Sequence, residues 1–154
     1  MKKTLASILI FLFCLAPSLF AQEGSTDESA IRKIIEQFTP MWTTPNGVEV
    51  FQKLSSDTHF VFLSTNSVLS REDFPQLLAK MLQDNPPIKH THAIKKIDIS
   101  GALAFEYGTL ELVRKNGQTT KGETLNVFFR EASGWKLIGN APVAELRKVL
   151  ADWP

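Results

Sequence analysis

Three short turn signals divide the stretch from His90 to Val143 into four runs of apolar and β-branched residues. The signals are Ser100-Gly101, Asn116-Gly117 and Ser133-Gly134. Turns this short join antiparallel neighbours, so they predict a meander of four strands. Alternate residues of each strand then share one face of the sheet, and the turn lengths decide which residues lie opposite each other.

The part of the chain before the meander shows helical periodicity. Thr26, Asp27 or Ser29 can cap a first helix, Gly47 to Leu54 forms a second, and Ser70 or Asp73 can cap a third. A short strand is expected over 59–64, with a turn near Asn66. The apolar stripes of the three helices are Ile31, Ile34, Ile35 and Phe38; Val48, Phe51 and Leu54; and Phe74, Leu77, Leu78, Met81 and Leu82. Helices followed by a long meander predict an α+β domain whose sheet buries one face against the helices.

The amino terminus predicts export. Lys2 and Lys3 precede an apolar run over 5–15, and Ala21 is the small residue that a signal peptidase requires. We therefore expect a signal peptide over 1–21, a flexible tail over 22–27 and a single domain over 28–150. The mature chain would be periplasmic or secreted, with no membrane attachment after cleavage.

Cleavage would also change the composition of the chain. It removes Cys14, the only cysteine, so the mature chain would have no disulfide, thiol nucleophile or thiolate metal site. Without Lys2 and Lys3, 15 basic residues remain against 16 acidic ones, and the formal net charge changes from +1 to −1. This balance argues against nucleic acid as a partner, because proteins that bind it usually carry a basic face.

The order of these elements resembles the nuclear transport factor 2-like superfamily, specifically its SnoaL-like branch, which includes a large bacterial family of unknown function. Two further features carry the resemblance: Trp42 after the first helix, and Gly134-Trp135-Lys136-Leu137-Ile138 at the start of the last strand. The resemblance covers about residues 28–143. It implies a cystatin-like cone, in which a strongly bent antiparallel sheet wraps around the amino-terminal helices and encloses an apolar pocket. The family uses this pocket for isomerases, dehydratases, hydrolases, cyclases and binding proteins without activity.

Ketosteroid isomerase, an enzyme of this superfamily, provides a test of whether catalysis carries over. The resemblance places Phe38 at the position of its tyrosine and Phe62 near the position of its general base. A phenyl ring cannot accept a proton, so this mechanism is not retained. Asn126 falls at the position of a second, protonated aspartate and keeps a hydrogen-bond donor there.

Two-residue turns at Ser100-Gly101 and Asn116-Gly117 would pair Tyr107 with Asn126 and Thr109 with both His92 and Thr124. A four-residue turn over 131–134 would pair Arg130 with Trp135, which places Gly139 beside Asn126. The face that carries Asn126 then has an apolar end, which includes Trp135 and Leu137, and a polar patch. The predicted ligand-binding residues are Trp42, Phe62, His92, Phe105, Tyr107, Thr109, Thr124, Asn126 and Phe128.

His92 and Glu111 would be diagonal neighbours on this face and are the candidate catalytic pair, since a carboxylate beside an imidazole supports acid–base chemistry. Several alternatives stay open. Glu111 can pair with His90 instead, and His92 can simply satisfy a structural hydrogen bond. Tyr107 and Asn126 can bond each other, and Thr109 and Thr124 can form an ordinary cross-strand pair. His90, His92 and Glu111 could together approach a metal ion, but we predict no metal and no other cofactor.

The opposite face is predicted to carry a Lys95–Glu106 pair among apolar residues, namely Leu110, Leu112, Leu125, Val127, Phe129 and Ile138. It is too apolar for bare solvent, which predicts a homodimer through the outer face of the sheet. The predicted function is binding of a small, mostly apolar molecule in the cone. One alternative is an isomerase, dehydratase or hydrolase that uses His92 and Glu111. Another is a dimeric interaction module without a ligand.

Overall fold

The computed structural model describes residues 26–64 and 67–151. The predicted signal peptide and residues 22–25 of the predicted tail lie outside these ranges. The chain begins with a first helix over 26–38. The elements that follow are the 3-10 helix η1 (Thr39–Trp42), α2 (Gly47–Leu54), β1 (Val61–Ser64), β2 (Ser67–Ser70), α3 (Phe74–Asp84), β3 (Pro87–Ser100), β4 (Leu103–Arg114), β5 (Thr119–Glu131), β6 (Gly134–Pro142) and α4 (Val143–Ala151).

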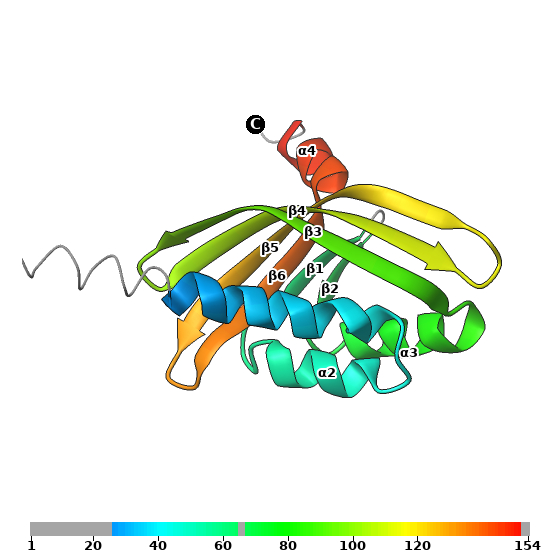
Figure 1. The fold of residues 1–154 in the computed structure, drawn as a ribbon, viewed down its shortest axis with the longest axis horizontal. Coiled ribbons are helices and arrows are strands. Elements are labelled where there is room, and N and C mark those ends of the chain that lie inside the picture. Colours follow the sequence, from blue (N-terminus) through cyan, green and yellow to red (C-terminus); the bar gives the residue numbers. More distant parts are fainter. Residues whose placement is uncertain (1–25, 65–66, 152–154) are drawn as a thin grey trace, which may run out of the picture.

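The six strands form one sheet in the order β2-β1-β6-β5-β4-β3. The sheet arches over the first helix, α2 and α3, which cover one side of it, and α4 lies on the other side (Figure 1). We call these two sides the inner face and the outer face. The α+β class is confirmed. The predicted bent sheet is mixed, because β1 runs parallel to β6 while the other neighbouring strands are antiparallel.

The core lies between the inner face and the helices. The first helix contributes Ile31, Ile35 and Phe38, as its periodicity predicts. Other buried members are Met41, Phe51, Leu54, Phe60, Phe74, Leu78, Ala104, Phe128, Trp135 and Leu137. Each large apolar side chain contributes about 1.5–3 kcal/mol on burial. Leu77, predicted in the stripe of α3, is exposed instead.

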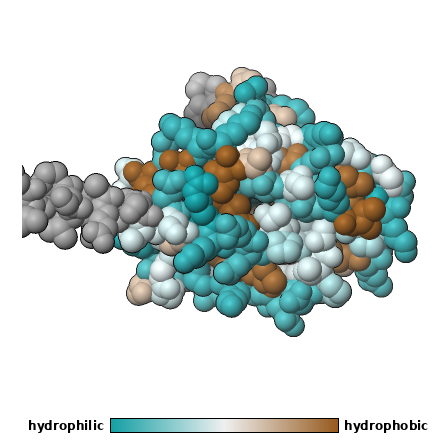
Figure 2. Space-filling view, viewed as in Figure 1, coloured by the Kyte–Doolittle hydropathy of each residue, from teal (hydrophilic) through white to brown (hydrophobic). Residues whose placement is uncertain are grey.

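Polar residues cover most of the side shown in Figure 2, with apolar patches between them.

The first helix is attached to the β5–β6 hairpin by Asp27. Its carboxylate accepts a hydrogen bond from Trp135 Nε1 at 3.0 Å and pairs with Arg130. An acidic side chain in the first turn of a helix is also favoured by the helix dipole. Thr26 and Asp27, at the end of the predicted tail, are therefore part of the ordered domain.

Two elements were not expected from the sequence. β2 is short and polar at both ends, and it forms because it pairs with β1. α4 follows the last strand and contacts β1, β5 and β6 on the outer face. In the part of the chain that the structure describes, no helix is long and apolar enough to cross a membrane.

The loop between β4 and β5 sets the position of the functional site. Arg114 and Gln118 form the last bonded pair, with Arg114 N donating to Gln118 O at 2.8 Å, so the loop contains three residues. Gly117, its last residue, has a φ of +85°, which is typical of three-residue hairpins. Glu106 therefore lies opposite Asn126, and Tyr107 lies opposite Leu125. The predicted pairing of Tyr107 with Asn126 is wrong by one residue, which exchanges the two faces of β4.

The other two hairpins also correct the predicted registers. The β3–β4 turn is Gly101-Ala102, and an irregularity between Ile94 and Lys96 shifts the pairing again, so His92 lies opposite Leu110 and not Thr109. In β5 and β6, Arg130 pairs with Trp135 as predicted. A further shift next to Phe128 then places Asn140, and not Gly139, opposite Asn126.

Candidate functional site

A group of polar side chains lies on the inner face, where soluble domains usually place apolar residues. Glu106 of β4, Asn126 of β5 and Asn140 of β6 lie opposite one another across three strands. His92 of β3 and Thr124 of β5 join them through hydrogen bonds. We call these five residues the inner polar cluster.

The carboxylate of Glu106 is the centre of this cluster and is 0% exposed. One of its oxygens lies 3.0 Å from His92 Nε2, and the other accepts a hydrogen bond from Asn126 Nδ2 at 2.7 Å. A buried carboxylate is tolerated only when its oxygens have such partners. The arrangement fixes the position of the carboxylate relative to the imidazole of His92.

A second layer of hydrogen bonds fixes Asn126. Asn140 Nδ2 donates to Asn126 Oδ1 at 2.5 Å and to Thr124 Oγ1 at 3.2 Å. The hydroxyl of Thr124 donates to the carbonyl oxygen of Ala141 at 3.3 Å. These contacts orient the amide of Asn126 so that its nitrogen faces Glu106. A network in which each member has partners is rigid and specifies one arrangement of the core.

Gly108 allows His92 and Glu106 to meet. The two residues come from neighbouring strands and approach each other above Gly108, which lies between them on the inner face. A Cβ at this position would lie 2.5 Å from Glu106 Oε1, 2.7 Å from His92 Nε2 and 2.8 Å from the carbonyl oxygen of Ala93. Only glycine leaves the space that the contact requires.

His90 lies beside the cluster on the same strand and face as His92. Its Nδ1 donates to the carbonyl oxygen of Thr39 at 2.7 Å, since a carbonyl can only accept. Burial lowers the pKa of His90 below its ordinary value of 6.5; the Thr39 hydrogen bond opposes this shift, and the nearby His92 adds to it. The imidazole of His90 is therefore neutral at pH 7.

Each of these two histidines has one ring nitrogen without a hydrogen bond to any described residue. Among the described residues, the only buried side-chain nitrogen or oxygen without a hydrogen-bond partner is Ser55 Oγ. His92 Nδ1 and His90 Nε2 form none of the hydrogen bonds found among the described residues, so neither has a partner within this part of the protein. The side chain of His92 as a whole is 6% exposed.

Aromatic side chains lie next to the polar group. The ring of Trp42 is 6.0 Å from that of His90 and 6.3 Å from that of Phe62, between centroids. Phe62 of β1 lies opposite Asn140 of β6, so it adjoins the cluster on the other side. Trp42 and Phe62, two of the predicted ligand-binding residues, thus lie at the edge of the inner polar cluster.

The structure separates the remaining predicted site residues between the two faces. His92, Thr124, Asn126 and Phe128 lie on the inner face as expected, with Phe128 in its apolar part. The predicted placement of Phe105, Tyr107, Thr109 and Glu111 on this face is wrong, because the shifted register turns all four outward. Phe105, for example, is 39% exposed.

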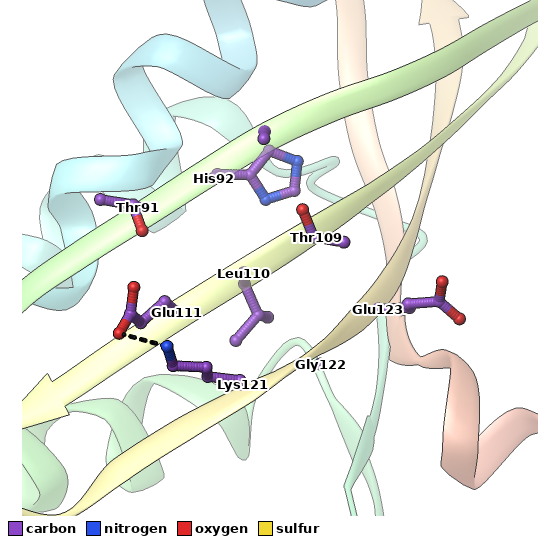
Figure 3. A pocket seen from close by; sticks show the side chains of 9 residues that line it. Thr91, His92, Thr109, Leu110, Glu111, Lys121, Gly122 and Glu123 are labelled. Atoms are coloured by element: carbon purple, nitrogen blue, oxygen red, sulfur yellow. Dashed lines mark ion pairs between the residues drawn. The ribbon is translucent and has the colours of Figure 1, made fainter.

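Glu111 lies in a groove of about 520 Å³ on the outer face, where it forms an ion pair with Lys121 at 3.0 Å (Figure 3). Lys121 lowers the pKa of Glu111 through this contact. Thr109 and Glu123 line the same groove, and Glu123 also binds the hydroxyl of Tyr107 and the amine of Lys95. His92 also borders this groove, but its imidazole bonds Glu106 on the inner face, whereas the carboxylate of Glu111 bonds Lys121 on the outer face. The two residues therefore do not form the predicted pair.

The sequence predicts Glu106 on the outer face, opposite Lys95. This prediction is wrong, because Glu106 lies on the inner face, opposite Asn126. Leu110 and Leu112 likewise lie on the inner face, while Leu125, Val127 and Phe129 face outward as predicted. A three-residue loop ending at Gly117 was the signal that could have identified Glu106. His90, His92 and Glu111 do not converge, and no group of three metal-binding side chains occurs within the described ranges.

Solved structures of other proteins share this arrangement of helices and sheet. No family model matches the sequence, and no curated protein matches it. A conserved protein from Planctomyces limnophilus superposes with a TM-score of 0.65 and 20% identity, over 76% of this chain and 94% of that one. An NTF2-like protein of unknown function from Shewanella oneidensis gives a TM-score of 0.59 and 14% identity, over 74% and 96%. The chain has the nuclear transport factor 2-like fold.

A third solved structure supports the nuclear transport factor 2-like fold. A domain of unknown function with a cystatin-like fold from Nostoc punctiforme superposes with a TM-score of 0.62 and 17% identity, over 82% of this chain and 84% of that one. The predicted nuclear transport factor 2-like, cystatin-like fold is confirmed, and membership of the superfamily stays a prediction. The SnoaL-like branch stays a prediction.

Proposed function

We propose that the protein binds a small, mostly apolar molecule between the inner face of the sheet and the helices. One observation carries this proposal: two histidine nitrogens without a hydrogen-bond partner among the described residues lie next to aromatic side chains in an otherwise apolar interior. Binding sites for small molecules typically combine an apolar lining with a few fixed polar groups. Trp42 and Phe62 would contact the apolar body of the ligand, and His90 and His92 would orient its polar end.

The rigidity of the inner polar cluster supports this role. Buried charges are costly, and a core made only of apolar residues would be at least as stable. Glu106 and its partners are therefore better explained by a requirement to hold His92 in place than by a contribution to stability. Asn126 and Thr124 would then hold the hydrogen-bond network around Glu106 in position and would not contact the ligand. The sequence predicts both as ligand-binding residues.

We also propose that the mature protein begins after Ala21 and is periplasmic or secreted. The basic Lys2 and Lys3, the apolar run after them and the small Ala21 support this proposal. Native mass spectrometry of the protein purified from its own host tests both statements. We expect the mass of a chain that begins at Gln22, together with a bound small molecule.

Two phenylalanines provide matched variants for this experiment. Phe62→Ala removes an aromatic ring beside the inner polar cluster, and we expect the bound molecule to be lost. Phe105→Ala removes a ring of equal size from the outer face, and we expect the molecule to be retained. The charge-state distribution reports whether each variant is folded. Two results would contradict the proposal. One is loss of the bound molecule in Phe105→Ala but not in Phe62→Ala. The other is a wild-type mature protein that carries no bound molecule in any preparation.

We further propose that the protein forms a homodimer through its outer face. Val61, Val68, Leu103, Phe105 and Phe129 are exposed although they are apolar. α4 covers part of this face and leaves an apolar groove of about 300 Å³. Exposed apolar surface of this kind often marks an interface. The dimer contact would then lie beside α4, over the ends of β4 and β5 that carry Phe105 and Phe129.

Light scattering coupled to size-exclusion chromatography tests the dimer. We expect the mass of two chains for the mature protein and of one chain for a Phe105→Glu, Phe129→Glu double variant, because charges cannot be buried in an apolar contact without a large cost. Leu77→Glu is the control, since Leu77 is equally exposed but lies on α3, away from the outer face. A monomeric wild-type protein would refute the dimer.

A further inference from the structure

The hydrogen bond between His92 and Glu106 determines which nitrogen of His92 carries the proton. A carboxylate oxygen accepts, so His92 Nε2 is the protonated nitrogen of the neutral ring. His92 Nδ1 then has a lone pair that no described residue binds. The same reasoning gives His90 an Nδ1–H, bonded to Thr39, and a free lone pair on Nε2.

Glu106 is well suited to hold this tautomer. It is fully buried, and Asn126 holds its second oxygen at 2.7 Å, so the carboxylate cannot rotate away from the imidazole. When His92 Nδ1 takes up a proton, the ring becomes positively charged, and the adjacent carboxylate stabilises that charge. A histidine held by a buried carboxylate in this way can act as a general base.

The hydrogen-bonding groups of the site also define what it would accept. The Nε2–H of His92, the amide nitrogens of Asn126 and Asn140 and the hydroxyl of Thr124 all donate to protein atoms. The two nitrogens without a partner among the described residues, His90 Nε2 and His92 Nδ1, are acceptors. This set favours a ligand that brings a proton to the site over one that brings an anionic group.

We propose that His92 is a general base, positioned by Glu106, which removes a proton from the bound molecule. This inference rests on the proposed binding site and adds a chemical step to it. The substrate class is a small apolar molecule with an acidic C–H or O–H group. Proton transfer forms an N–H bond at His92 Nδ1, and the electron pair of the broken bond stays on the substrate. No metal or redox partner takes part in this step.

The probe 5-nitrobenzisoxazole tests the step without knowledge of the natural substrate. It is small and apolar, and a base removes the proton from the carbon beside its ring nitrogen. The electron pair of that C–H bond forms a nitrile as the N–O bond breaks, and the oxygen leaves with its electron pair as a coloured nitrophenolate. Binding of the probe is measured separately from turnover by quenching of tryptophan fluorescence.

We expect the protein to eliminate the probe faster than free imidazole does at equal concentration. In His92→Gln, the glutamine amide can still donate to Glu106 but has no basic nitrogen, so the rate should fall by about 100-fold or more. Glu106→Gln should lower the rate by about tenfold or more, because the imidazole is no longer held in one tautomer. His59→Gln changes an exposed histidine and should leave the rate unchanged.

Nitrogen-15 NMR of the histidine rings gives a second, ligand-free measurement. Neutral His92 should show a protonated Nε2 and an unprotonated Nδ1, and Glu106→Gln should convert this signal to a mixture of tautomers. A merely structural Glu106 would affect stability but not the tautomer. Observation of the Nδ1–H tautomer in the wild-type protein would overturn the proposal regardless of any rate.

The two measurements separate failure of this inference from failure of the proposed function. Binding of the probe without elimination beyond the imidazole level would refute the general base and leave the binding site standing. A rate that survives His92→Gln, or that only His90→Gln removes, would refute the role of His92. Absence of binding would count against the proposed function, and the tautomer of His92 would then decide the inference alone.

Discussion

Replacing Glu106 with alanine is expected to lower the free energy of unfolding by about 3–5 kcal/mol. The substitution leaves the ring nitrogen of His92 and the amide of Asn126 without their acceptor inside the protein. Each buried donor that loses its partner costs about 1–3 kcal/mol. The missing side-chain volume adds a cavity, because Glu106 is 0% exposed and its neighbours cannot fill the space fully.

Urea denaturation followed by circular dichroism measures this loss. Glu111→Ala is the matched control on the same strand, since it removes a carboxylate of the outer face that forms only a surface ion pair with Lys121. Its expected cost is small, because an ion pair at the surface contributes little to stability. Equal costs for the two variants would show that Glu106 is not the centre of a buried network.

The second large effect is expected at Gly108. Gly108→Ala should lower the free energy of unfolding by about 1–3 kcal/mol, because the added methyl group overlaps Glu106, His92 and the backbone of Ala93. The side chains can move away only by separating His92 from Glu106, and the carbonyl of Ala93 cannot move without distorting β3. The same variant should therefore also lose the single tautomer of His92.

Gly122→Ala is the control for this prediction. Gly122 lies on the adjacent strand β5, its backbone is not in the left-handed region, and a Cβ there would have no atom within 4 Å. A glycine-to-alanine change at such a site should leave stability unchanged or raise it by up to about 1 kcal/mol, through the unfolded state. If both variants lose the same stability, the effect belongs to strand glycines in general and not to the contact between His92 and Glu106.

Several elements of the fold could be predicted from local sequence. α2 has the predicted bounds, Gly47–Leu54, because its apolar residues follow the helical repeat and Ser55 ends it. The three hairpins lie where their glycine-containing turns indicate, with Gly101, Gly117 and Gly134 at positive φ. These features depend on residues close together in the chain, and their physical causes act within a few residues.

The candidate site could be predicted only in part, because it depends on register. A hairpin loop of three residues instead of two changes the partner of every residue in the strands that follow it. Asn126 and Thr124 were placed correctly because their face is fixed by the buried Phe128 on the same strand. Glu106 and Tyr107 were exchanged, since their strand is amphipathic with either assignment and the loop alone decides between them.

The contact between His92 and Glu106 could not be predicted at all from local patterns. It requires the β4–β5 loop length, the shift near Ile94 and the absence of a side chain at Gly108 to act together. Irregularities in a strand depend on how the sheet bends around the helices, and that bending is set by the core as a whole.

The sequence by itself therefore determined the fold class, the three helices before the meander and the four-stranded meander, because periodicity and turn chemistry are local properties of the chain. Only the tertiary structure decided which carboxylate faces His92. Glu111 and Glu106 lie on the same strand, but five residues apart, and an odd separation places them on opposite faces of the sheet. The packing of the inner face against the helices selects Glu106, and with it the chemistry proposed for this protein.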